Sequence, residues 1–204
     1  IIPVGSATWT AGVIISNKTI RLAGIGTTQT FITDNIPRVT PEVSLIKYYT
    51  TSNALVAEIA GLHISSGTVT QEQTSGRIRL LGDSKLVRVH HNVYTNAWSA
   101  IFGAEGFLHG VFDHNRTVTA DHAHPLVLEH GSWQPYNGAT NMAGTAYDFG
   151  HGSWADDPYL GTDKYIFWES NVDEDKTSPV NANGIDIFEG GRMVHRFNIK
   201  TNAL

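Results

Sequence analysis

The chain has 204 residues, a size that suits one domain, and hydrophobic residues make up 41% of it, enough to bury a core and to exclude general disorder. Its formal net charge of −5 leaves no basic surplus for a phosphate backbone or an anionic membrane, so we expect neither nucleic acid nor a membrane as its partner. There is no cysteine, which excludes disulfides, thiolate metal sites and a cysteine nucleophile, and no apolar run reaches the ~18 residues of a membrane span.

Charged residues are only 16% of the chain, against ~25% in an average soluble domain, and Thr, Ser, Asn and Gly replace them. Such a composition is typical of β-rich extracellular proteins. We therefore predict a secreted or cell-surface protein.

Short runs of β-branched and aromatic residues recur along the chain, and turn-forming residues usually bound them. In chain order they predict strands at 13–15, 19–22, 30–32, 57–59, 77–80, 86–89, 110–112 and 165–168. No amphipathic segment of helical period separates them, which argues against alternating βαβ units. The pattern therefore predicts an all-β chain.

A repeat links four of these segments. Residues 87–93, 110–116, 166–172 and 193–199 each read as an apolar strand, two mostly polar residues, an asparagine and a mostly apolar residue. The asparagines are 23, 56 and 27 residues apart, and we interpret the middle gap as two coils plus an insertion. An asparagine at a sharp bend tolerates left-handed backbone, and its amide can bond to the asparagine one coil away. The repeat predicts a solenoid, with a β-sandwich rich in Asn turns as the alternative.

This pattern resembles the right-handed parallel β-helix of the pectate-lyase-like superfamily. Residues 4–9 and 20–26 are similar to the first coils of such proteins, in which an apolar strand runs into Gly-x-Gly and a later Thr-x-Ile, here Thr30-Phe31-Ile32, begins the next sheet. Residues 190–198 resemble a coil of bacterial β-helix proteins of unassigned activity. The resemblance covers most of the chain outside 131–161 and implies one domain over 1–204. The stretch 131–161, rich in Gly, Trp and Tyr, is the long loop insertion that the spacing of the asparagines indicates.

Terminal coils of a solenoid need caps that protect their edges. No amphipathic N-terminal helix is evident, and the last coil runs to Leu204 without a cap. We therefore expect a chain that lacks native end coils or caps, with a complete small domain as the alternative. Unpaired terminal edges would permit end-to-end self-association.

The segment 110–115 is similar to the strand-Asp-His motif of pectate lyases. The resemblance implies catalytic roles for Asp113 and His114 beside calcium, which would neutralise a uronate and acidify its α-proton. The alternative is a structural role of both residues at a bend.

His122 and His124 alternate with Ala123, so a strand would place both imidazoles on one face, at a spacing that strand-borne metal sites use. Glu129 or His130 is the candidate third ligand. Histidines that merely line a groove are the alternative.

A further polar group lies late in the chain and comprises Asp186, Glu189, Arg192, His195 and Arg196. β-Elimination from a uronide needs a base and a cation for the carboxylate, and Arg192 or Arg196 is a candidate. Hydrolysis instead needs a carboxyl pair, for which Asp186 and Glu189 are candidates. Ordinary surface ion pairing is the alternative.

Aromatic residues crowd the expected insertion, and flat rings stack well on sugars. Loops on a rigid scaffold often carry binding sites, so we predict a substrate-binding role for Trp133, Tyr136, Trp154, Tyr159 and the neighbouring His130. The alternative is that these rings pack the loop onto the solenoid.

These features predict an extracellular carbohydrate-active β-helix, lyase-like or hydrolase-like, that acts on or binds an extended polysaccharide in a surface groove, with calcium as the candidate cofactor. The alternative is a non-enzymatic structural or adhesive β-helix, such as a surface, fibre or tailspike-like protein. A convergent set of acid, base and cation would favour the enzyme, and scattered polar groups would favour the structural protein.

Overall fold

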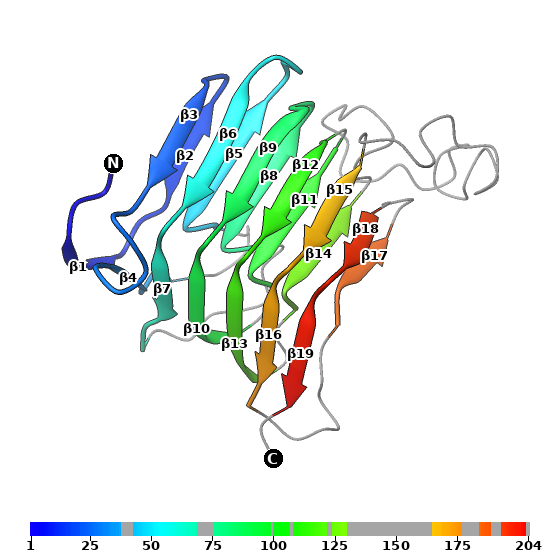
Figure 1. Cartoon of the computed structure of the whole chain (residues 1–204). Coiled ribbons are helices and arrows are strands. Elements are labelled where there is room, and N and C mark those ends of the chain that lie inside the picture. Colours follow the sequence, from blue (N-terminus) through cyan, green and yellow to red (C-terminus); the bar gives the residue numbers. More distant parts are fainter. Residues whose placement is uncertain are drawn as a thin grey trace.

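The structure is a computed structural model of the chain. It describes residues 1–37, 43–68, 76–98, 100–106, 108–121, 124–129, 165–176, 184–188 and 193–202. The expected insertion at 131–161 lies outside these ranges. Within them the chain is all-β and winds into a parallel β-helix (Figure 1), which confirms the fold class expected from the sequence.

The strands form three parallel sheets. Sheet A contains, in spatial order, β1 (Gly5–Trp9), β4 (Thr30–Asp34), β7 (His63–Ser66), β10 (Val93–Trp98), β13 (Arg116–Asp121), β16 (Val172–Asp175) and β19 (Ile199–Asn202). Sheet B contains β2 (Val13–Ser16), β5 (Ile46–Thr50), β8 (Ile78–Gly82), β11 (Phe102–Glu105), β14 (Leu126–Glu129) and β17 (Asp186–Phe188). Sheet C contains β3 (Ile20–Ala23), β6 (Val56–Ala60), β9 (Leu86–His90), β12 (Gly110–Asp113), β15 (Ile166–Glu169) and β18 (Met193–Arg196).

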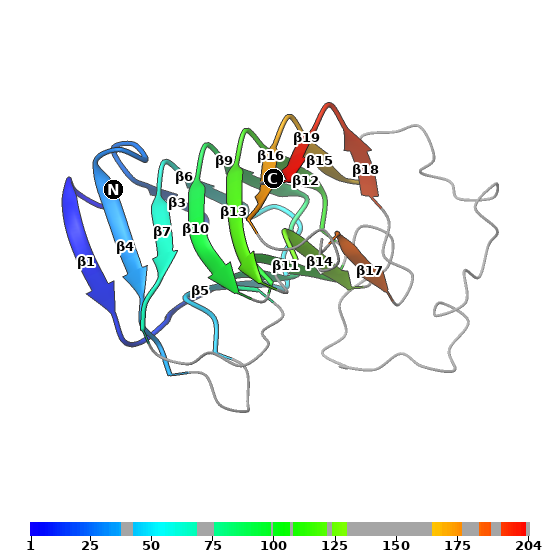
Figure 2. The same ribbon diagram turned by 90° about the horizontal axis from the view of Figure 1, so that it is seen from below.

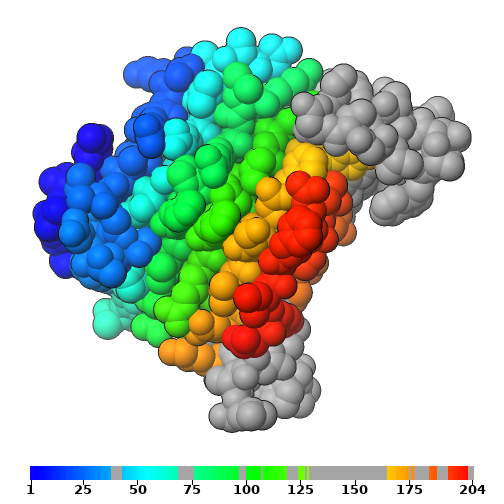
Figure 3. Space-filling model, viewed as in Figure 1, coloured from blue at the N-terminus to red at the C-terminus, as the bar shows by residue number. Residues whose placement is uncertain are grey.

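Each coil visits sheets A, B and C in turn, and the chain then returns to sheet A one position further along the helix axis. Figure 2 shows the strands of sheet A side by side in front, and Figure 3 shows the successive coils as parallel bands of colour. Equivalent residues therefore stack on one another ~4.8 Å apart. Among the described residues no helix is long and apolar enough to cross a bilayer.

The core is a set of side-chain stacks inside the solenoid. Alternate strand residues point inward, and the inward positions of sheet C place Ile59, Val89, Phe112 and Trp168 in one row. The ring of Phe102, on sheet B, contacts three other aromatic rings. Its centroid lies 4.9 Å from that of Tyr94, 5.4 Å from that of Phe112 and 5.6 Å from that of Trp168. This burial of apolar and aromatic surface holds the three sheets together.

The bend from sheet C to sheet A uses a left-handed residue in coil after coil. His91, His114, Ser170 and Phe197 have φ of 52°, 52°, 55° and 59°, and Gly61 occupies the same place with φ of 69°. Each directly precedes the asparagine position of the repeat. The expectation that the asparagine itself would take the left-handed conformation is therefore wrong.

The asparagines form the ladder that the repeat predicts. Nδ2 of Asn92 donates to Oδ1 of Asn115 at 3.0 Å, Asn115 donates to Asn171 at 3.1 Å, and Asn171 donates to Asn198 at 3.2 Å. The Nδ2 atoms also donate to strand carbonyls of the preceding coil, such as Val89 O at 2.9 Å. The side chain of each asparagine must point into the protein for its amide to make these bonds. The change of chain direction at the bend is therefore made by the left-handed residue before it.

The interpretation of the 56-residue gap as two coils is wrong. Asn115 bonds directly to Asn171, and β12 pairs directly with β15. One coil thus contains β13, β14, β15 and the 36 residues between the last two, 130–165. The extra length belongs to one connection, and the spacing of asparagines alone could not distinguish one long connection from two coils.

Replacement of Asn115 by alanine tests the ladder. Asn115 is 1% exposed. Without its side-chain amide, the backbone N and Nδ2 of Asn92 lose their acceptor, and the carbonyl oxygen of Val89 loses its donor. We expect Asn115→Ala to lower the free energy of unfolding by about 3–5 kcal/mol in urea titrations, because buried groups are left unpaired. Asn198→Ala, at a partly exposed position where water replaces the lost partners, should cost clearly less; equal losses would contradict a ladder that stabilises through burial.

The left-handed bend gives a second expectation. A left-handed non-glycine residue costs ~1–2 kcal/mol, so Ser170→Gly should raise the free energy of unfolding by up to about 1 kcal/mol, while Ser170→Val should lower it. Thermal unfolding of the pair measures the difference. Indistinguishable midpoints would show that the bend stores no strain.

Candidate functional site

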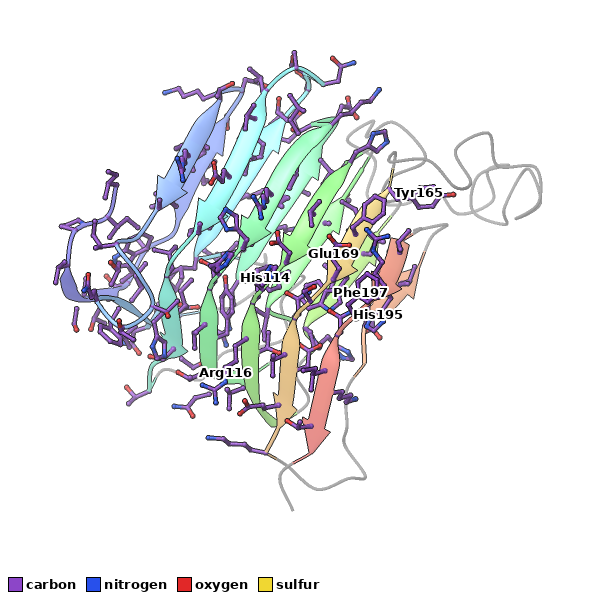
Figure 4. All side chains as sticks on the ribbon, in the orientation of Figure 1. His114, Arg116, Tyr165, Glu169, His195 and Phe197 are labelled. Atoms are coloured by element: carbon purple, nitrogen blue, oxygen red, sulfur yellow. The ribbon has the colours of Figure 1, made fainter. Side chains whose placement is uncertain are left out.

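Polar side chains gather on the outward face of sheet C, where the strands run into the bend. In-register pairing places His90, Asp113, Glu169 and Arg196 in one row at the ends of successive strands. Glu58 and Arg88 pair in a second row two residues earlier. We call these six outward side chains the sheet C strip. Figure 4 shows His114 and Phe197 at the bend beside the strip, with Glu169 on the strand side.

Asp113 is the centre of the strip and is 3% exposed. Its Oδ1 accepts from Arg88 Nε at 3.0 Å, and its Oδ2 accepts from Arg88 NH2 at 2.9 Å and from His114 Nδ1 at 2.8 Å. Burial acts to raise the pKa of Asp113, but the hydrogen bonds from Arg88 and His114 and the charge of Arg88 outweigh it and hold that pKa below its usual value. Asp113 is therefore an ionised carboxylate in a fixed position.

A chain of histidines continues from this carboxylate. The rings of His114 and His91 stack with centroids 4.9 Å apart and planes within 5°. His91 Nδ1 contacts His90 Nδ1 at 2.8 Å, and His90 Nε2 contacts Glu58 Oε1 at 3.0 Å. Partial burial and the charges of His90 and His114 lower the pKa of His91, which favours its neutral imidazole.

The next coils extend the strip with a second ion pair. Arg196 Nε donates to Glu169 Oε2 at 2.6 Å. The Arg196 guanidinium also lies 5.2 Å from the centroid of the Phe167 ring and 5.4 Å from that of Phe197. This end of the strip therefore combines a cation, a carboxylate and exposed aromatic surface.

The predicted site residues fall into three groups. Asp113 and His114 contact each other, and Arg196 lies in the same row. Asp186 is on sheet B instead, 3.5 Å from His124, whose Nδ1 also donates to Gly184 O at 3.0 Å. The structure thus places Asp186 and Arg196 on different sheets and does not bring them together.

Other predicted residues are not placed. Glu129 ends β14 on sheet B, but its side chain is outside the described part of the chain. Entirely outside the described residues are His122, His130, Trp133, Tyr136, Trp154, Tyr159, Glu189 and Arg192.

Sequence reasoning missed Arg88, His90, His91, Glu58 and Glu169. The alignment on the asparagines already identifies three of these five, because it places His90 and Glu169 at the same position as Asp113 and Arg196, and His91 at the same position as His114. Reading the alignment by column would have identified the strip.

Calcium, which the resemblance implies beside Asp113, does not fit these residues. Calcium requires six to eight oxygen ligands. Both carboxylate oxygens of Asp113 accept hydrogen bonds from Arg88, and the remaining neighbours in the cluster offer imidazole nitrogen. The positive guanidinium also cancels the charge that would attract the ion.

A separate pocket of about 430 Å³ lies at the end of the helix interior, and its lining includes Asp173, Met193, His195 and Lys200. Thr117 Oγ1 donates to Asp173 at 2.5 Å. Burial raises the pKa of Asp173, although Thr117 and the charges of His195 and Lys200 oppose the shift. His195 belongs to this interior end, whereas the adjacent Arg196 belongs to the outward strip.

Comparison of the chain with protein-family models, with curated proteins and with solved structures gives no match. Function must therefore be argued from the chemistry of the site.

Arg88→Gln tests the electrostatics of Asp113. Because the pKa of Asp113 is lowered in the folded protein, this carboxylate contributes stability that is present above the unfolded pKa and is lost as pH falls through the folded pKa. We expect the variant to lose about 2 kcal/mol at neutral pH, since hydrogen bonds to a charged group disappear, and to approach the wild type in acid, where the carboxyl is protonated in both.

Urea titrations across the acid range provide the measurement. Arg21→Gln is the control, because Arg21 bonds to Glu58 from a 70% exposed side chain and should matter little. If Arg88→Gln lowers the free energy of unfolding by the same amount at every pH, the packing of the Arg88 side chain, and not its ion pair with Asp113, stabilises the protein.

Proposed function

We propose that this chain is an extracellular carbohydrate-binding β-helix of the pectate-lyase-like type, which holds an extended glycan along the sheet C strip. The observation that carries the proposal is the straight row of polar outward side chains from successive coils. A polymer with regularly repeating hydroxyl and carboxylate groups is complementary to such a row, because coils present equivalent positions at a constant spacing.

The chemistry of the strip supports sugar recognition. Charged groups held in fixed positions by ion pairs donate and accept hydrogen bonds without further ordering, which reduces the entropic cost of binding. Phe197 adds an exposed ring, 76% accessible, next to the Arg196–Glu169 pair. Aromatic surface beside charged donors suits the mixed polar and apolar faces of a pyranose.

Binding has more support than bond cleavage. Asp113 is a poor proton donor because its pKa is low, and Arg88 and His114 occupy its oxygens. Glu169 is likewise bonded to Arg196. The strip therefore favours binding over the lyase-like or hydrolase-like reaction in which Asp113, His114 and Arg196 would be catalytic.

A structural role is the second candidate, and a specific observation favours it. The ion pairs Arg88–Asp113 and Arg196–Glu169 join neighbouring coils of sheet C, and Arg116–Glu174 does the same on sheet A. Charges arranged in this way would stabilise a fibre or surface protein without any ligand.

A polysaccharide panel separates these candidates. We expect saturable binding of the folded chain to one of pectin, alginate, glycosaminoglycan or neutral glucan in affinity electrophoresis or calorimetry. Arg196→Gln and Phe197→Asn should each weaken it about tenfold, or ~1.4 kcal/mol. Asparagine at 197 keeps the left-handed backbone accessible.

Lys47→Gln, on the outward face of sheet B, is the matched control and should bind as the wild type does. Unsaturated uronide absorbance and new reducing ends are followed in the same samples. Their appearance would contradict a purely binding function. If no polysaccharide of the panel is bound or cleaved, the result would favour the structural role.

A further inference from the structure

His91 and His114 form a cluster that neither the glycan proposal nor the ion pairs require. They occupy the same left-handed bend position in adjacent coils, and their rings lie parallel and 4.9 Å apart. One ligand-capable atom from each of His91, Asp113 and His114 lies within 4.8 Å of the others. Both imidazoles are exposed on the surface of the bend.

The hydrogen bonds determine which nitrogen of each neutral ring holds a lone pair. Asp113 Oδ2 has no proton to give, so His114 Nδ1 carries the hydrogen of their 2.8 Å bond and His114 Nε2 carries the lone pair. In the same way Glu58 requires a hydrogen on His90 Nε2.

Neutral His90 then has its lone pair on Nδ1 and accepts from Nδ1 of His91. His91 Nε2 is left with a lone pair too. Both stacked rings therefore present the same unprotonated nitrogen. We assign these tautomers from the bonding partners.

We propose that His91 and His114 bind a divalent transition-metal ion of the zinc class through their Nε2 atoms. Asp113 and His90 act as positioning residues, since each bonds to the opposite nitrogen of a ligand ring. A carboxylate behind a histidine ligand orients the ring and raises its basicity, an arrangement found in protein metal sites. The proposal does not depend on glycan binding.

The rings of His91 and His114 already stack with centroids 4.9 Å apart. Two nitrogens bound to one zinc at ~2.1 Å are at most ~4.2 Å apart, so zinc would hold the two rings with their Nε2 atoms within that separation. Their exposure allows this without repacking the core. Solvent or a ligand would complete the coordination. Imidazole nitrogen favours Zn²⁺, Ni²⁺ and Cu²⁺ over Ca²⁺ and Mg²⁺, which prefer oxygen.

Calorimetric titration of the full chain with Zn²⁺ alone, without any glycan, tests the proposal. We expect saturable binding of zinc and no response to Ca²⁺. His91→Asn and His114→Asn should each weaken zinc binding at least tenfold, and the double variant should abolish this site. Asparagine is chosen because it accepts the left-handed backbone that alanine disfavours.

Ser170→Asn is the matched control, because it introduces the same residue at the same bend position one coil further on and should leave zinc affinity unchanged. Asp113→Asn should reduce affinity ~10–100-fold although both imidazoles remain. Circular dichroism verifies that each variant is folded. Absence of saturable zinc binding by the wild type would overturn the proposal, as would a double variant that binds like the wild type.

Discussion

The asparagine ladder at the bend between sheets C and A is the constraint on which the described structure depends. Each amide both donates to and accepts from a neighbouring coil inside the protein, so the asparagines must stack in register. Register at this point determines register along the adjoining strands, because a slip would move every side chain to the opposite face. The left-handed residue before each asparagine makes the bend and turns its own side chain outward.

Register also explains why the outward charges occur in pairs. Stacked coils bring equivalent residues close together, and like charges in such a row would repel. Sheet C does place two carboxylates, Asp113 and Glu169, side by side. Each is paired with a different arginine, Asp113 with Arg88 on one neighbouring coil and Glu169 with Arg196 on the next coil. The ion pairs that offset this repulsion also hold the donors and acceptors of the strip in place, so a structural role and the proposed binding role would share one physical origin.

The bend brings two kinds of chemistry to one corner of the molecule. Asp113 is buried but stays ionised because the positive charge of Arg88 stabilises its carboxylate. Its Oδ2 also accepts a hydrogen bond from His114 and so orients that ring. The sheet C strip is the surface on which we propose that a polymer binds, whereas the stacked histidines are the compact site that we propose for an ion. The ladder contact from Asn115 to Asn171 spans 56 residues of sequence as readily as that from Asn92 to Asn115 spans 23, so a long connection can be added to one coil without disturbing this corner.

The sequence by itself determined the parallel β-helix, the strands of sheet C and the asparagine ladder, because short apolar runs and a recurring Asn are local signals with a direct physical meaning. Most strands of sheet A were not predicted. It also identified Asp113 and His114 as candidate site residues, and their side chains bond to each other. Only the tertiary structure decided that His91, and not the following asparagine, is left-handed, that one coil spans the 56-residue gap, and that Asp186 and Arg196 are on different sheets. The reason is that contacts between coils follow from register, and connections of unequal length conceal register from a linear reading.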